Sequence, residues 1–122
     1  MIHDVELAIV SALQNTIPTY PDEAPTSAAY PYAVISGKRL TTDDSISNWI
    51  IEINVWDKNK YNSRAEAKAD AIEKVLDFHR FAFANGNLVC LYKSQRDDIL
   101  DTDETIKRVR IQFSTTVYES EA

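Results

Sequence analysis

Glycine and cysteine are scarce in this chain, and each scarcity excludes a class of protein. Two glycines in 122 residues are too few for a glycine-rich loop that would cradle a phosphate. The single cysteine, Cys90, cannot form a disulfide within the chain, so the protein fits a reducing compartment. Because no apolar run approaches about 18 residues and no basic-then-apolar leader is present, we expect neither membrane insertion nor secretion.

Positive charge is also in short supply. Lys and Arg total 13 against 19 Asp and Glu, which gives a formal net charge of −6. A protein that holds a phosphate backbone needs a basic surface, so this balance argues against nucleic-acid binding. The length predicts one domain, residues 1–122, large enough to bury about two-thirds of its unfolded surface in a single core.

The stretch 48–76 is the most regular part of the sequence. Its first nine residues alternate apolar and mixed positions, which predicts a half-buried central strand. The apolar positions are Trp49, Ile51, Ile53 and Val55. After a polar turn, Ser63 and Glu66 have the spacing of a capping box, and an amphipathic helix is predicted to follow.

Similar patterns predict the other elements. A first helix is expected at residues 4–15 with Asp4 as its N-cap, and further strands at 32–36, 88–92 and 106–118. All four prolines fall in residues 18–31, which predicts a stiffened, extended connection. Residues 39–47 are expected to form a polar loop or hairpin tip, and residues 95–105 an acidic loop. The order of elements predicts an α+β fold: an antiparallel sheet of about four strands with two helices packed on one face.

No arrangement of reactive residues indicates an enzyme. The two histidines, His3 and His79, have no acidic partner at a spacing typical of a triad or a zinc site. Cys90 lies in an apolar strand, where a thiol packs as a core residue. The acidic loop lacks the glycine of a calcium-binding loop. We therefore predict no catalytic residue, no metal and no cofactor.

The face of the sheet away from the helices is predicted to meet a partner. Trp56, Arg108 and Arg110 fall on this face and stay partly exposed. Trp56 is a candidate for a subunit contact. Arg108 and Arg110 could bind an anion, or they could pair with Glu52 across the sheet, which is the more ordinary arrangement.

Several motifs, in order along the chain, resemble one family. They are Tyr20-Pro21-Asp22-Glu23-Ala24-Pro25, Tyr30-Pro31-Tyr32-Ala33-Val34, Ile53-Asn54-Val55-Trp56, the alanine-rich helix with Ala65, Ala69, Asp70 and Ile72, and the strand Arg108–Ser114. Together they resemble the tail-completion, or tail-to-head joining, proteins of long-tailed bacteriophages and prophages, which are similar in fold to tail terminators. Asn54 stands where an Asp is commoner in the family, and the acidic stretch before the last strand is an addition to its pattern.

The resemblance implies a non-enzymatic virion protein that forms a homo-hexameric ring between the head connector and the tail tube. It implies partners in the head-completion or connector protein and the tube protein, assembly in the host bacterial cytoplasm, and DNA that passes through without specific binding. A negative lumen would keep DNA from adhering. We expect the lumen or ring-face charge to come from Asp43, Asp44, Asp97, Asp98, Asp101, Asp103 and Glu104. The expected subunit contacts are Tyr20, Tyr30, Trp56, Arg108 and Arg110.

Two other functions are compatible with the sequence. One is a dimeric α+β domain that binds a small acidic ligand on its open sheet face, at Trp56, Tyr92, Arg108 and Arg110. The other is a regulatory interaction module. A six-fold ring stoichiometry would separate the virion protein from both of these functions. A saturable ligand-induced rise in melting temperature would favour the small-molecule site.

Overall fold

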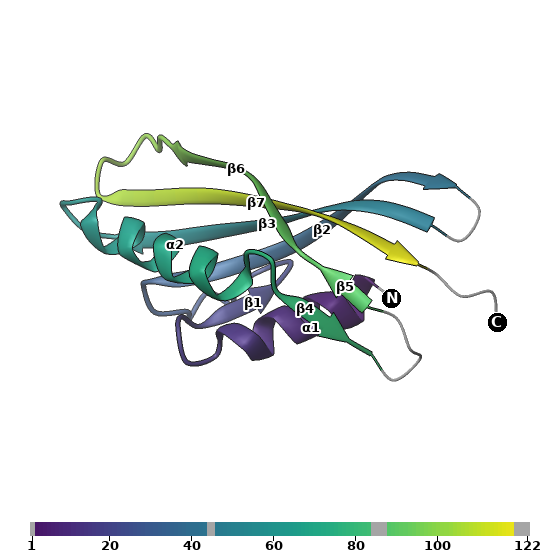
Figure 1. Cartoon of the computed structure of the whole chain (residues 1–122). Coiled ribbons are helices and arrows are strands. Elements are labelled where there is room, and N and C mark those ends of the chain that lie inside the picture. Colours follow the sequence, from purple (N-terminus) through teal and green to yellow (C-terminus); the bar gives the residue numbers. More distant parts are fainter. Residues whose placement is uncertain (1, 44–45, 84–87, 119–122) are drawn as a thin grey trace.

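The computed structural model describes residues 2–43, 46–83 and 88–118 as two helices, a five-stranded sheet and a small two-stranded sheet (Figure 1). The helices are α1 (Ile2–Leu13) and α2 (Ser63–Leu76). The strands are β1 (Thr19–Pro21), β2 (Tyr32–Asp43), β3 (Ile46–Lys58), β4 (Arg80–Ala82), β5 (Leu88–Cys90), β6 (Tyr92–Ile99) and β7 (Ile106–Tyr118).

The large sheet has the strand order β1-β2-β3-β7-β6, with β4 and β5 forming the small sheet. The central strand β3 pairs antiparallel with β2 on one side and with β7 on the other along nearly its whole length. This confirms the prediction that residues 48–56 form the central strand. The strand is longer than predicted, because its pairing continues from Ile46 to Lys58.

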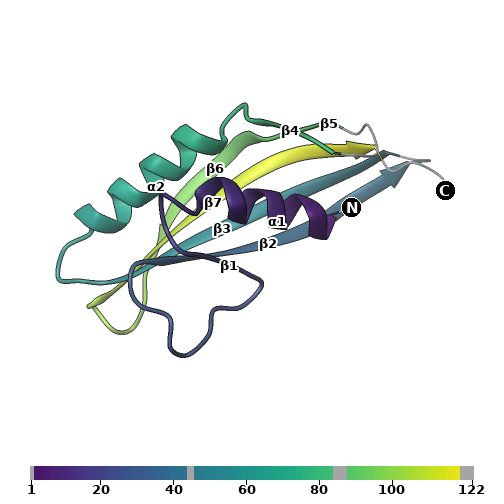
Figure 2. The same ribbon diagram turned by 90° about the horizontal axis from the view of Figure 1, so that it is seen from below.

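Both helices cover the same face of the large sheet, as predicted (Figure 2). The core forms between them from apolar residues that alternate along the strands or recur along the helices. The largest fully buried side chains are Phe113, Ile9, Leu13, Ile17, Ile35, Ile51, Ile53, Ile72, Leu76, Leu91, Ile111 and Val5. Trp49 is also buried, at the end of the apolar series on β3.

The predicted sheet of about four antiparallel strands is wrong in two places. Within the proline-rich connection, Thr19–Pro21 forms a short strand parallel to β2, so the sheet is mixed. The expected acidic loop 95–105 is largely strand, because β6 runs to Ile99 and pairs with β7. The charged residues of β6 are compatible with an edge strand, because one edge of the strand faces water and its charged side chains form ion pairs within the chain.

The predicted capping box of α2 is also wrong. The helix begins at Ser63, so Asn62 occupies the N-cap position, and its side chain makes no capping hydrogen bond. The start of the helix is held instead by Arg64, whose guanidinium donates to the buried carboxylate of Asp57 at 2.9 and 2.5 Å. Likewise α1 begins at Ile2, which places Asp4 in the first turn instead of at the N-cap.

Arg96 links the edge strand β6 to three carboxylates of α2. Arg96 points to the helix face of the sheet and donates to Asp70 at 2.6 Å, to Glu73 at 2.7 Å, and to Glu66. Partial burial works against the charge of Arg96, but the hydrogen bonds to these carboxylates outweigh it and raise the pKa of the guanidinium. This network closes the side of the core along β6.

Candidate interaction surface

The open face of the sheet gathers the residues that the sequence predicted as subunit contacts. Strand register places Tyr32 beside Trp56 and Trp56 beside Arg108, which forms one row across β2, β3 and β7. In the next row, Tyr20 aligns with Val34, then Asn54, and then Arg110. We call Tyr20, Tyr30, Tyr32, Trp56, Arg108 and Arg110 the aromatic–arginine surface.

Tyr32 joins the aromatic members of this surface. Its ring lies 5.3 Å from the ring of Tyr30 and 6.1 Å from the ring of Tyr20, in a tilted and an edge-on contact respectively. Partial burial, followed by the neighbouring Tyr30, raises the pKa of the Tyr32 hydroxyl. Tyr30 remains exposed, whereas Tyr20, Tyr32 and Trp56 are half-buried. These contacts make a broad aromatic platform with polar tips, which is typical of protein interfaces.

The two arginines of the surface are held by partners within the chain. Arg108 stacks over the Trp56 ring at 4.8 Å and donates from Nε to Asn54 Oδ1 at 2.9 Å. Arg110 makes an ion pair with Asp97 at 2.8 Å. The predicted pairing with Glu52 is therefore wrong: Glu52 lies opposite Gln112 and accepts from Asn54 Nδ2 at 2.9 Å.

The acidic residues proposed for the ring lumen do not form one cluster. Asp97 is on the open face against Arg110, while Asp98 lies on the helix face beside Glu66. A hydrogen bond with Asp98, together with burial, raises the pKa of Glu66, and Arg96 opposes this shift. The chain thus uses the charges of residues 97 and 98 partly in its own folding.

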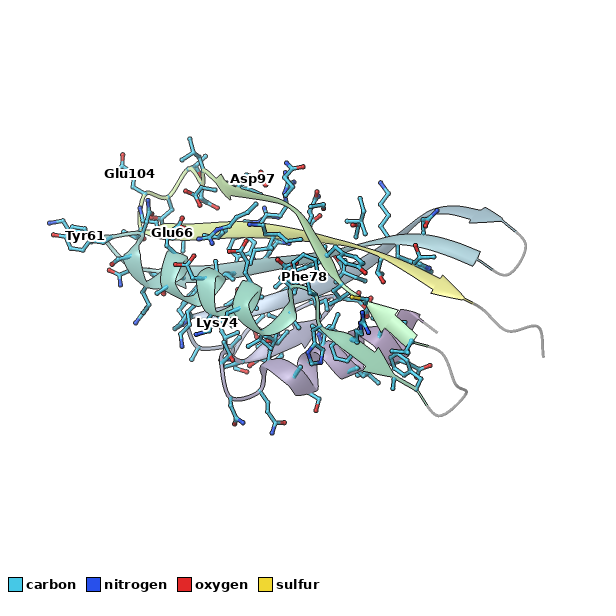
Figure 3. All side chains as sticks on the ribbon, viewed as in Figure 1. Tyr61, Glu66, Lys74, Phe78, Asp97 and Glu104 are labelled. Atoms are coloured by element: carbon cyan, nitrogen blue, oxygen red, sulfur yellow. The ribbon has the colours of Figure 1, made fainter. Side chains whose placement is uncertain are left out.

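The remaining acids of this stretch are exposed in the connection between β6 and β7. Asp101 accepts the Asp103 N–H at 3.0 Å, and Asp103 accepts the Thr105 N–H at 2.9 Å and the Thr105 hydroxyl at 2.7 Å. These bonds from Thr105 lower the pKa of Asp103. Glu104 is exposed at the same end of the molecule (Figure 3). Asp101, Asp103 and Glu104 therefore form an ordered, negatively charged tip.

Of the other two predicted acids, Asp43 has its backbone at the opposite end of the sheet. β2 ends at Asp43, which is paired with Ile46 and so lies far along the strands from the β6–β7 connection (Figure 1). The Asp43 side chain and all of Asp44 fall outside the described part of the chain. The structure thus separates the Asp43 backbone from the acidic tip along the length of the molecule.

A groove of about 540 Å³ opens beside the acidic tip, between the start of α2 and the β6–β7 connection. Its lining mixes apolar side chains such as Ile99 and Ile106 with charged ones such as Lys60, Glu66 and Lys107. In the described ranges, no group of three or more His, Cys, Asp or Glu side chains could hold a metal ion. No helix among those described is long and apolar enough to span a membrane.

The exposed aromatic and charged surfaces of the chain suit contact with other macromolecules. The family match assigns the chain to a class of structural virion components and not to an enzyme family. The chain belongs to the tail completion protein gp17 family, whose model matches residues 5–118. This confirms the resemblance and places the protein among the structural components of phage tails.

A solved structure agrees in fold. A chain from a structure described as the virion of a native gene transfer agent particle matches with a TM-score of 0.69 and 16% sequence identity. The match covers 94% of this chain and 87% of that chain. At this identity the likeness shows a shared fold. No curated protein sequence matches this chain.

Sequence reasoning missed two residues that organise these sites. Tyr32 was assigned to a strand, but its role in joining Tyr20 and Tyr30 follows only from its register opposite Trp56. Arg96 was assigned to a loop, although the alternation of Arg96 with Asp97 could have indicated a strand with one residue on each face. The position of Asp57, two residues beyond Val55 on the inner face, likewise predicts burial.

Proposed function

We propose that this phage tail protein forms a homo-hexameric ring at the junction of head and tail, or at the top of the tail tube, around the channel through which DNA leaves. Membership of the tail completion family supports a place in the virion. The observation that carries the ring is the aromatic–arginine surface. Five residues expected to make subunit contacts, far apart in sequence, meet at one end of the open face.

Such a surface has the chemistry of an interface. Its aromatic rings are already packed on one another, so little side-chain freedom is lost when a partner covers them. Arg108 and Arg110 are oriented by Trp56, Asn54 and Asp97, which prepares their exposed nitrogen atoms for a second acceptor. A closed ring needs heterologous contacts, and one such patch on each subunit supplies half of each contact.

We further propose that the two acidic groups lie at the two ends of the channel. If the strands run roughly along the ring axis, Asp101, Asp103 and Glu104 charge one mouth, and Asp43 and Asp44 charge the other. Negative charge at a mouth repels DNA phosphates and prevents DNA from adhering as it passes. This makes specific the sequence-based expectation that these residues supply lumen or ring-face charge.

Complementation of tail-deficient particles tests this function. Particles that lack the chain should carry unjoined or incomplete tails, and the added protein should restore infectious particles with the chain at the head-proximal end of the tail. Neutralising Asp101 and Glu104 together should slow DNA ejection without changing the unfolding free energy. Asp103 is left intact because it accepts two hydrogen bonds from Thr105, and Asp101 is replaced by Asn, which keeps an acceptor for the Asp103 N–H. Normal ejection kinetics in the folded variant would contradict the acidic-mouth role.

The rival function, a dimer that binds a small acidic ligand on the open face, receives less support. Arg110 is neutralised by Asp97, and Arg108 is committed to Trp56 and Asn54. A ligand would have to displace or share these partners. A saturable rise in melting temperature with small dicarboxylates would favour the rival, since a ligand that binds only the folded state stabilises it.

A further inference from the structure

A second group of exposed apolar side chains belongs to the segments that follow α2: Phe78 (Figure 3), Leu88 on β5 and Tyr92 on β6. Phe78 is 69% exposed, Leu88 57% and Tyr92 46%. The rings of Phe78 and Tyr92 are in edge-on contact at 5.4 Å, and the Tyr92 hydroxyl interacts with the Cys90 thiol on the same small sheet as Leu88. Large apolar side chains gathered in this way mark an interaction surface.

The backbone at Phe78 supports this interpretation. Phe78 has a φ of 60°, a left-handed conformation that is strained for a bulky residue. The strain is maintained by hydrogen bonds from Phe78 N to Leu91 O at 2.8 Å and from Leu91 N to His79 O at 3.1 Å. The strained residue gains no burial inside the subunit, which indicates that its ring is displayed for a partner.

Positive charge borders this apolar patch. Arg80 is exposed on β4 and acts electrostatically on Tyr92, and Lys93, the residue after Tyr92 on β6, has a side chain that is 43% exposed. The nearby acids are already engaged: Asp77 accepts the Lys93 N–H at 2.9 Å, and Glu73 binds both Lys93 and Arg96. We call Phe78, Arg80, Leu88, Tyr92 and Lys93 the Phe78 patch. Its chemistry suits an acidic partner with an exposed aromatic or apolar side chain.

The N-terminal part of the same chain has this complementary chemistry. Residues 1–37 contain no Lys or Arg but include Asp4, Glu6, Asp22 and Glu23. Asp22 and Glu23 are exposed directly after β1, at the edge of the sheet opposite β6. We call Asp22 and Glu23 the acidic edge.

The acidic edge and the Phe78 patch lie at nearly the same height along the strands. Register carries Tyr92 across Ser114 and Ile50 to Lys38 on β2. Asp22 follows Pro21, which pairs with Ile35, and is therefore level with Ser36. The two positions differ by two residues along β2, or about 7 Å. In a ring closed by rotation about an axis along the strands, opposite edges at one height meet between neighbours.

We propose that the Phe78 patch of one copy binds the acidic edge of the next copy, with Arg80 and Lys93 against Asp22 and Glu23. This inference rests on the proposed ring. It identifies the pair of surfaces that meet in each heterologous interface between neighbouring copies. The aromatic–arginine surface then extends the contact onto the open face.

Cysteine cross-linking in assembled tails tests the contact directly. In a Cys90→Ser background, one chain carries Glu23→Cys and a second carries Arg80→Cys, and both are produced together in cells that assemble tails. Mild oxidation should give covalent dimers only when both chains are present. A chain with both cysteines should give a ladder that ends at the hexamer. Cross-links from either single-cysteine chain alone would indicate an isologous contact and overturn the proposal.

The matched control pairs Glu23→Cys with Leu100→Cys. Leu100 is exposed at the same edge of the sheet as the Phe78 patch and follows Ile99, which register places level with Tyr32. It therefore lies about 16 Å along the strands from the level of Asp22, on the side away from Tyr92, and beyond disulfide reach. Cross-linking of the control in place of the test pair would refute the contact. Tails that contain the chain but show no cross-link would refute the contact alone, whereas particles without the chain would refute the proposed function itself.

Charge reversal provides an independent readout. Arg80→Glu should lower incorporation into tails by about tenfold or more, because it sets like charges against the acidic edge. Glu23→Lys added to the same chain should restore much of the loss. The unfolding free energy of both variants should match that of the unmodified protein. Normal incorporation of Arg80→Glu would overturn the proposal.

Discussion

The two faces of the large sheet differ in how far their side chains are buried and in where those side chains find partners. On the helix face, apolar residues are fully buried, and Asp57 and Arg96 each form ion pairs with residues of the same chain. On the open face, Trp56 and the tyrosines around it are only partly covered, and they line up with arginines that keep exposed nitrogen atoms. The helix face therefore accounts for folding, whereas the open face has a chemistry that folding alone does not require.

The sharpest test of the helix face is the removal of a large core side chain. Phe113 is fully buried at the centre of β7, opposite Ile51. Phe113→Ala should lower the unfolding free energy by about 3–5 kcal/mol, because it removes buried apolar area and leaves a cavity. Urea denaturation measures the effect. A loss below about 1 kcal/mol would contradict the assignment of this face as the core.

Arg96 tests whether ion pairs of the helix face are part of the fold. Arg96→Ala leaves Glu66, Asp70 and Glu73 close together without their shared cation. We expect a loss of about 1–3 kcal/mol in unfolding free energy, measured by the same denaturation. The matched control is Lys93→Ala, which removes an exposed ion pair with Glu73 and should cost less than about 1 kcal/mol. Equal losses would contradict a special role for Arg96.

A substitution at Trp56 tests whether the open face contributes more to assembly into tails than to the stability of the fold. Trp56→Ser removes the ring under Arg108 and should lower the unfolding free energy by no more than about 1–2 kcal/mol, since the ring is only half-buried. Incorporation into tails should nevertheless fall strongly. Pull-down of tails followed by immunodetection measures incorporation. Normal assembly of the variant would show that Trp56 is not part of the interface. Unfolding of the variant would show that Trp56 is part of the core.

The smallest effect is expected at the edge of β2, where Glu6 accepts the Gly37 N–H at 3.0 Å. Burial, followed by the charge of Asp22, raises the pKa of Glu6 above its ordinary 4.5 in the folded state. Folding thus favours the protonated carboxyl, so this contribution to stability is present below pH 4.5 and is lost as pH rises through the folded pKa. Glu6→Gln keeps an acceptor and should make stability less dependent on pH in this window. An unchanged pH profile of the unfolding free energy would contradict the assignment.

Much of this architecture could be predicted from local pattern. The alternation on β3, the helical spacing on both helices and their common face follow from periodicity, which depends on each residue's own neighbours. The strand Tyr92–Ile99 could not be predicted from local pattern. A run such as Asp97-Asp98 is compatible with a strand only when residues distant in sequence, such as Arg110 and those on the α2 side of the sheet, interact with its carboxylates. The positive φ of Phe78 depends on hydrogen bonds across two segments and leaves no local signal.

The candidate site was predictable by composition but not by arrangement. Tyr20, Tyr30, Trp56, Arg108 and Arg110 were each recognisable as unusual for an exposed position. Their assembly into one surface required the register of four strands and the presence of Tyr32 between them. The acidic stretch 97–104 shows the reverse outcome, since the structure places Asp97 and Asp98 on opposite faces of β6 and the other acids of this stretch in the exposed β6–β7 connection.

Negative-stain imaging of the purified protein at high concentration, combined with a mass measurement and with images of assembled tails, tests the central claim most directly. The account predicts six-fold rings with an open centre, either free in solution or at the head-proximal end of the tail. A discrete dimer in solution, together with tails whose ends lack a six-fold ring containing this chain, would contradict it.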